Sequence, residues 1–214
     1  MERNGHILNK GQYYTIENPT DFEATISRSH FIASLRFASS RDKFEEELKK
    51  IVALFPKATH YCWAYRFVAS GLEHSSDAGE PSGTAGRPIL GALKKYSLLN
   101  VMAVVTRFYG GVKLGVRGLI AAYGETTLGA IANADIVIKE PRASLKFSCS
   151  YDYYNSFLSI LQKYRIKIDS LSPTFEEVIS GEILIPTAEL PAILDEFDNM
   201  RTRGSMFKYF IGGE

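Results

Sequence analysis

The chain has 214 residues, enough for one large domain or two small ones. Hydrophobic residues make up 45% of it and charged residues 23%, the balance of an ordinary globular protein. The net charge of +1 excludes strong nonspecific attraction of the whole chain to nucleic acid. No stretch is apolar for long enough to span a membrane, and residues 1–14 lack the apolar core of a secretory signal. We therefore expect a cytoplasmic protein with no membrane partner.

Residues 1–140 have the pattern of a mixed α+β domain. Strands are indicated where apolar residues alternate with polar ones, or where apolar and aromatic residues run continuously. Such stretches lie at 12–38 (two or three strands), 61–68, 100–108 and 134–139. The stretch 100–108 is so apolar that we expect cover on both of its faces. The polar stretch 70–83 predicts a loop.

Helical spacing of apolar residues predicts the helices of this domain. The first opens with a capping pattern at Ser39 and Asp42 and runs to residue 55. A second helix is expected to begin at Thr84. A third apolar stripe at helical spacing covers 120–131.

Residues 141–214 have the order β-α-β-β-α-β, which is typical of a ferredoxin-like fold. We therefore divide the chain into domains 1–140 and 141–214. The second domain has a net charge of −2, which argues against a strong role in RNA binding. Cys62 and Cys149 lie in predicted strands and are better explained as buried small hydrophobic residues than as a disulfide.

Two glycine-rich segments flank the strand predicted at 100–108: GEPSGTAGRPI at 79–89 and TRFYGGVKLGVRG at 106–118. Ten of the 17 glycines lie between residues 60 and 124, with seven Arg or Lys against three acids. Glycine permits positive φ and close approach, and cations beside backbone N–H groups attract anions. We expect the two segments to converge on a phosphate-like anion. The candidate residues are Arg87, Lys113, Arg117, Arg107, Ser82, Thr84, Gly83, Gly86, Gly110, Gly111 and Gly115.

The same motifs also have structural explanations. The glycines can serve turn geometry, and Thr84 can cap a helix. Asp77 and Glu80 have the ligand chemistry of a magnesium site with a nucleotide phosphate. We favour a helix-dipole or loop hydrogen-bond role for each of them. We predict neither a metal ion nor a cofactor.

Catalytic explanations are weaker. His60 and Cys62 share a predicted strand, and a core role is favoured because no second Cys/His pair has suitable spacing for a metal. Residues 74–77 contain the residue types of a hydrolytic triad, but triad members meet from separate segments. Tyr109, at a strand end, is open to two interpretations, base stacking or packing.

The chain resembles the YigZ/IMPACT family, in its bacterial type with a C-terminal ferredoxin-like domain. The motifs that carry the resemblance are ATHYCWAYRF at 58–67, SSDAGEPSGTAGRPIL at 75–90 and VVTRFYGGVKLGVRGLIAAYG at 104–124. Family members usually have a second acid where this chain has Ala78, and a small residue where it has Arg117.

The resemblance implies a fold for each domain. The first would be similar to the second domain of a small-subunit ribosomal protein and to domain four of elongation factor G. Small-molecule kinases share that fold. The second would be similar to domain five of the same elongation factor.

The resemblance also implies a role in translation. Our leading interpretation is a non-enzymatic protein that binds RNA or the ribosome, or regulates translation, through the glycine-rich basic face. One alternative is an enzyme acting on a phosphorylated small molecule or nucleotide. Another is a protein-interaction module that competes for a translation-control scaffold, with a translation-control protein as its partner.

Overall fold

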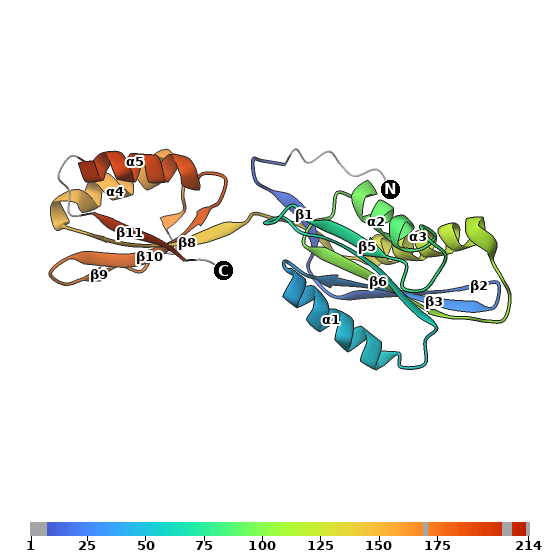
Figure 1. Cartoon of the computed structure of the whole chain (residues 1–214). Helices are drawn as coiled ribbons and strands as arrows, with labels where there is room; N and C mark the ends of the chain where they lie inside the picture. The colour runs from blue at the N-terminus through green and yellow to red at the C-terminus, as the bar shows by residue number, and fades with distance from the viewer. Residues whose placement is uncertain (1–7, 169–170, 203–206, 213–214) are drawn as a thin grey trace. The chain divides into compact units, whose positions relative to one another are not determined.

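The computed structural model describes residues 8–168, 171–202 and 207–212 of the chain (Figure 1). It divides into two compact units, each with its own hydrophobic core. The N-terminal unit is Tyr13–Lys139, and the C-terminal unit begins at Glu140 and includes residues 8–12. Both units combine helices with antiparallel sheets, which confirms the predicted α+β class. Within the described ranges, no helix is both long and apolar enough to cross a membrane.

A five-stranded antiparallel sheet forms the centre of the N-terminal unit. In sheet order its strands are β2 (Thr20–Ile26), β3 (Ser29–Phe37), β6 (Val101–Phe108), β4 (His60–Arg66) and β5 (Glu73–Ser76). Every residue of β6 except the last is buried, so the predicted cover on both faces is confirmed. Strands β1 (Tyr13–Ile16) and β7 (Ile136–Lys139) pair separately as a two-stranded sheet.

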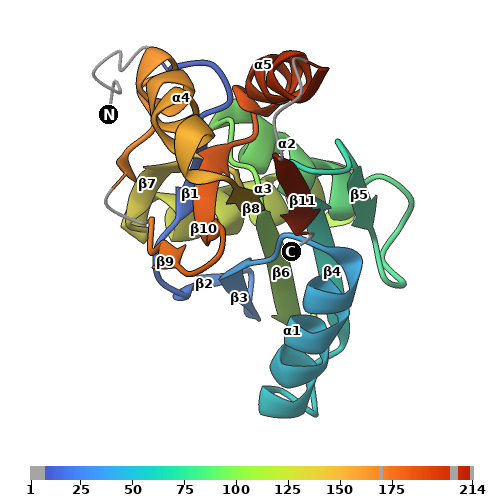
Figure 2. The same ribbon diagram turned by 90° about the vertical axis from the view of Figure 1, so that its left-hand side faces the viewer.

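Helices cover both faces of the five-stranded sheet (Figures 1 and 2). Because successive residues of a strand face opposite ways, β6 serves two cores. Ala103 and Val105 pack in the core with α2 (Gly86–Lys95) and α3 (Gly115–Asn133). Met102 and Val104 pack in the core with α1 (Arg41–Leu54) on the other face.

Two local predictions in this unit are corrected. The residue that caps α1 is Ser40, whose Oγ accepts from Lys43 N at 3.3 Å, and not Ser39. The expected loop 70–83 contains strand β5, which pairs only with β4 at the edge of the sheet. Its four side chains are exposed or half-buried, so the sequence shows no apolar alternation there.

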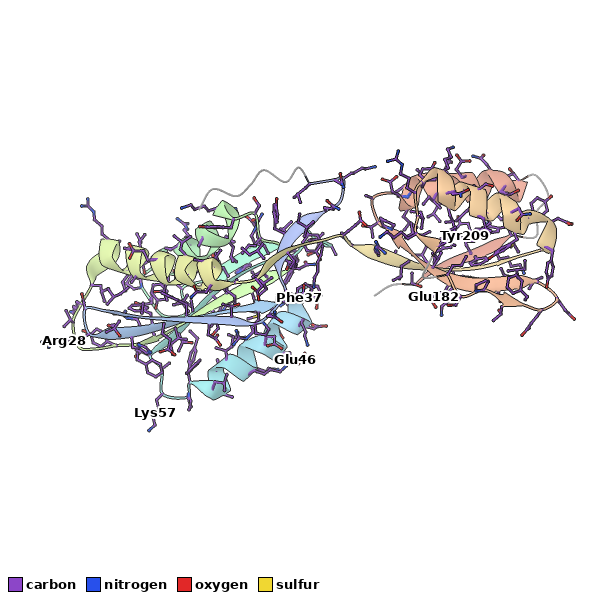
Figure 3. All side chains as sticks on the ribbon, turned by 180° about the vertical axis from the view of Figure 1, so that it is seen from behind. Arg28, Phe37, Glu46, Lys57, Glu182 and Tyr209 are labelled. Atoms are coloured by element: carbon purple, nitrogen blue, oxygen red, sulfur yellow. The ribbon has the colours of Figure 1, made fainter. Side chains whose placement is uncertain are left out.

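The C-terminal unit confirms the predicted β-α-β-β-α-β order. Its elements are β8 (Arg142–Cys149), α4 (Tyr151–Lys163), β9 (Thr174–Phe175), β10 (Ile179–Pro186), α5 (Leu190–Thr202) and β11 (Lys208–Gly212). The sheet order is β11-β8-β10-β9, all antiparallel. Figure 3 shows Tyr209 on the side of the sheet that the helices cover and Glu182 on the opposite side. Cys62 and Cys149 are buried free thiols, as predicted.

Candidate functional site

The two glycine-rich segments converge on one cleft in the N-terminal unit, with a volume of ≈ 440 Å³. Its lining comes from the start of β4, the first glycine-rich segment, and the chain from the end of β6 into α3. The lining residues are Thr59, His60, Glu80, Pro81, Arg107, Tyr109, Lys113, Leu114, Gly115, Val116 and Leu119. The expected convergence is therefore present, although most of the predicted phosphate ligands lie outside the lining.

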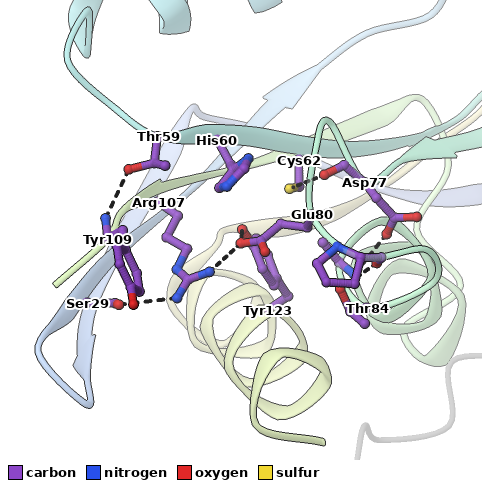
Figure 4. A network of polar contacts seen from close by, with 12 residues as sticks. Ser29, Thr59, His60, Cys62, Asp77, Glu80, Thr84, Arg107, Tyr109 and Tyr123 are labelled. Atoms are coloured by element: carbon purple, nitrogen blue, oxygen red, sulfur yellow. Dashed lines mark hydrogen bonds and ion pairs between the residues drawn. The ribbon is translucent and has the colours of Figure 1, made fainter. Parts of the chain in front are cut away.

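A buried ion pair joins the two segments beneath the cleft (Figure 4). Arg107 Nη1 lies 2.5 Å from Glu80 Oε1, and the two side chains are only 5% and 4% exposed. The hydroxyl of Tyr123 in α3 donates to the same Glu80 oxygen at 2.8 Å. Arg107 Nη2 donates to Ser29 Oγ on β3 at 3.3 Å. These contacts tie the first segment to the central strand and to α3.

Arg107, which we expected to bind a phosphate, lies in a buried environment. Its guanidinium is buried, lies 5.3 Å from the ring centroid of Phe31, and is neutralised by Glu80. An arginine so held gives little net attraction to a distant anion. The hypothesis that Glu80 binds magnesium loses support as well, because its carboxylate is already paired with Arg107.

Polar groups around the cleft are only partly satisfied. Arg107 Nε has no hydrogen-bond partner among the described residues, and the contacts of Glu80 with Arg107 and Tyr123 are both made by Oε1. His60 Nδ1 lies 3.0 Å from the carbonyl of Ala78, so this nitrogen is the donor. Thr59 Oγ1 accepts from Tyr109 N at 3.1 Å, which leaves its hydroxyl proton free to donate.

Asp77 occupies the N-terminal end of α2. Its carboxylate accepts from the backbone N–H groups of Gly83 at 2.8 Å and of Ala85 and Gly86 at 2.9 Å each. Desolvation alone would raise the pKa of Asp77, but the three hydrogen bonds, aided by the charge of Arg87, lower it overall. Asp77 thus has the helix-terminus role that we favoured from the sequence.

This arrangement bears on several residues of the predicted phosphate site. The N–H groups of Gly83 and Gly86 donate to the chain's own carboxylate, so an external phosphate does not find them free. Thr84 is buried, and its hydroxyl donates to the carbonyl of Pro81 at 2.7 Å. Ser82 is exposed. The anion-binding capacity of this helix end is therefore satisfied within the fold.

Two further glycines serve packing within the chain. A Cβ added to Gly110 would lie 1.9 Å from Arg28 O, and one added to Gly86 would lie 2.8 Å from the Ser76 backbone. The close approach that we assigned to a ligand is made by the protein's own main chain at these positions. Gly111 and Gly115 differ, since a Cβ would meet nothing within 4 Å and their φ values are +83° and +69°.

Three of the predicted cations remain at the surface: Arg87, Lys113 and Arg117 are exposed, and none has an ion-pair partner in the described part of the chain. Lys113 lines the cleft. Arg87 and Arg117 lie in the first turns of α2 and α3.

Sequence reasoning missed the other side of the cleft. His60 was assigned to the core, yet it is half-buried and lines the cleft beside Thr59. The apolar lining residues Leu114, Val116 and Leu119 were not singled out. Only the pairing of His60 with Arg107 across β4 and β6 places these residues together, and no local pattern in the sequence carries that pairing.

Fold and site together define a two-unit α+β protein with a cleft between glycine-rich loops. The family described as "Impact N-terminal domain" matches residues 27–131. IMPACT family member YvyE of Bacillus subtilis (strain 168) is 37% identical over 181 residues, 84% of this chain and 82% of that protein. IMPACT family member YigZ of Escherichia coli (strain K12) is 30% identical over 196 residues, 88% and 92%. The chain belongs to the IMPACT family.

A solved structure supports the fold over nearly the whole chain. A crystal structure described as that of a hypothetical protein has a TM-score of 0.65 and 25% sequence identity. The similarity covers 95% of this chain and 98% of that one.

Proposed function

We propose that the protein binds RNA of the translation machinery, without catalysing a reaction, through the exposed cations beside the cleft. The observation that carries the proposal is the set of three unpaired cations, Arg87, Lys113 and Arg117, around the two helix starts. Cations that already sit in ion pairs contribute little to binding a polyanion, whereas unpaired ones release counterions from it. The family resemblance supplies the link to translation.

The packing of α2 on α3 supports a surface shared by Arg87 and Arg117. A Cβ added to Gly124 of α3 would lie 3.8 Å from Cβ of Pro88, the residue after Arg87. Arg117 lies on the same face of α3, two helical turns before Gly124. Along the axis of α3, Arg117 and Gly124 are therefore about 10 Å apart. Phosphates of a single strand can therefore meet both arginines, with Lys113 at the cleft.

The proposal excludes catalysis because the carboxylates available for it are engaged. Asp77 is held by three N–H groups, and Glu80 by Arg107 and Tyr123. Asp77 cannot act as a general base without breaking contacts that hold the loop, and the charge of Glu80 is neutralised by Arg107. The alternative of a translation-control protein as partner is an outcome of the test below.

The test is the salt dependence of RNA binding by the full chain, followed by fluorescence anisotropy. With three phosphates contacted on a single strand, log K should fall with log salt at a slope of about −2. Arg87→Gln, Lys113→Gln and Arg117→Gln should each reduce the slope by about 0.7. Lys49→Gln is the matched control, since Lys49 is an exposed cation on α1, across the sheet.

A flat salt profile, or equal effects of the four substitutions, would overturn the proposal. Salt-insensitive capture of a translation-control protein with no RNA affinity would favour the protein-interaction alternative instead.

A further inference from the structure

The cleft holds polar atoms whose bonding capacity the fold leaves unused. Arg107 Nε is buried without a partner among the described residues, in a side chain that is 5% exposed. Glu80 meets Arg107 and Tyr123 through Oε1, and neither of these contacts uses Oε2. Buried polar groups in native proteins are nearly always satisfied, so the unmet buried donor of Arg107 beside an open cleft points to a ligand.

The rest of the cleft suits a flat ring. The side chain of Tyr109 is 45% exposed, and its ring centroid lies 5.2 Å from the Arg107 guanidinium carbon. Leu114, Val116 and Leu119 give the lining an apolar part. The volume of ≈ 440 Å³ falls in the range of small-molecule sites. Unstacked bases bind proteins by stacking on aromatic rings and by hydrogen bonds along their edges.

We propose that the cleft binds one unstacked nucleobase that carries an exocyclic amino group: adenine, cytosine or guanine. In this arrangement the base stacks against Tyr109, its amino group donates to Glu80 Oε2, and a ring nitrogen or carbonyl accepts from Arg107 Nε. Uracil fits poorly, because two carbonyls flank its single N–H and the carboxylate repels them. The inference rests on the proposed function, with the base belonging to an RNA strand held by the surrounding cations.

The experiment compares short RNA oligomers of adenine, cytosine or uracil with an abasic oligomer of the same length, all with the full chain. We expect adenine and cytosine oligomers to bind about tenfold more tightly than uracil or abasic ones. Tyr109→Ala should reduce the affinity for the adenine oligomer about tenfold and leave abasic binding unchanged. Val116→Trp, which fills the cleft from an exposed position, should have the same effect.

A matched control and a free-ligand arm separate the possible failures. Val112→Ala alters an exposed residue of the same loop outside the cleft lining and should change nothing. If all oligomers, abasic included, bind equally with the predicted salt slope, the base pocket is overturned and the proposed function stands. If no RNA binds but adenosine does, and Val116→Trp abolishes that binding, the proposed function fails and the ligand is a free nucleoside. If neither RNA nor adenosine binds, both proposals fail.

Discussion

Replacing Asp77 tests whether a side-chain carboxylate organises the first glycine-rich segment. In the folded protein this one group accepts three backbone N–H bonds at the start of α2. Asp77→Ala removes every acceptor. Asp77→Asn keeps an acceptor at the Oδ1 position for Ala85 and Gly86 but sets an amide donor against the N–H of Gly83.

The expected loss can be placed from these contacts. Removing a helix N-terminal acceptor costs about 0.5–2 kcal/mol of folding free energy. Because one carboxylate here satisfies three donors, we expect the upper end, about 2 kcal/mol, for Asp77→Ala. Asp77→Asn should cost about 1 kcal/mol, since it forfeits one hydrogen bond of the three.

The loss of folding free energy on replacing Asp77 should depend on pH in a defined direction. Folding lowers the pKa of Asp77, because the three hydrogen bonds outweigh the opposing effect of desolvation. A group of this kind contributes stability above its unfolded pKa and loses that contribution as the pH falls through its folded pKa. The difference in free energy of unfolding between wild type and Asp77→Asn should therefore be largest at pH 7 and should decrease below about pH 4.

Trp63 supplies the assay. It is the chain's single tryptophan, and it pairs with Ser76, next to Asp77, across β4 and β5. Urea unfolding followed by its fluorescence reports on the N-terminal unit within the full chain. Asp42→Asn, at an exposed first-turn position of α1, is the control and should change stability by less than about 0.5 kcal/mol. Wild-type stability in Asp77→Ala, or a gap that is constant down to acid pH, would refute the reasoning.

Three further predictions use the same molecule. Arg107→Met should cost about 3–5 kcal/mol in urea unfolding, because it strands the buried Glu80 carboxylate, and a loss under about 1 kcal/mol would contradict the buried pair. Gly110→Ala should destabilise by at least about 1 kcal/mol, whereas Gly91→Ala, in an open helical position, should stabilise by about 0.5–1 kcal/mol; equal melting shifts would refute the packing account. Burial raises the pKa of Cys62 to about 12, so iodoacetamide at pH 8 should leave it unmodified in mass spectra of the folded protein, and rapid labelling would count against its burial.

The elements that the sequence predicts well are those with a strong apolar period. Strand β6 is buried on both faces, so nearly all of its residues are apolar. Helix α1 is buried on one face, so its apolar residues recur every three to four positions. Strand β5 has no such pattern of apolar residues. In the sheet it pairs with β4 through its backbone, and backbone hydrogen bonds do not depend on residue type.

The candidate site likewise has features that the sequence predicts and features that it does not. Glycine-rich composition sufficed to predict that segments 79–89 and 106–118 converge, because both flank one strand. It did not assign the N–H groups of the first segment, since a free helix end and one capped by Asp77 contain the same glycines. The pairing of Glu80 with Arg107, 27 positions apart, follows from the sheet register and from Tyr123 on α3. Neither the sheet register nor the contact with Tyr123 can be predicted from the local pattern of residues in the sequence.

In the RNA complex that we propose, the position of Asp77 decides how the strand is held. Because its carboxylate fills the N-terminal end of α2, phosphates are left to the side chains of Arg87, Lys113 and Arg117. Contacts of this kind are sensitive to salt and indifferent to base sequence. In that complex, any preference among RNAs must arise elsewhere, and the Glu80 carboxylate and the Tyr109 ring in the cleft are where we expect it. Affinity and selectivity should therefore respond to different substitutions, the first to the cations and the second to Tyr109 and Val116.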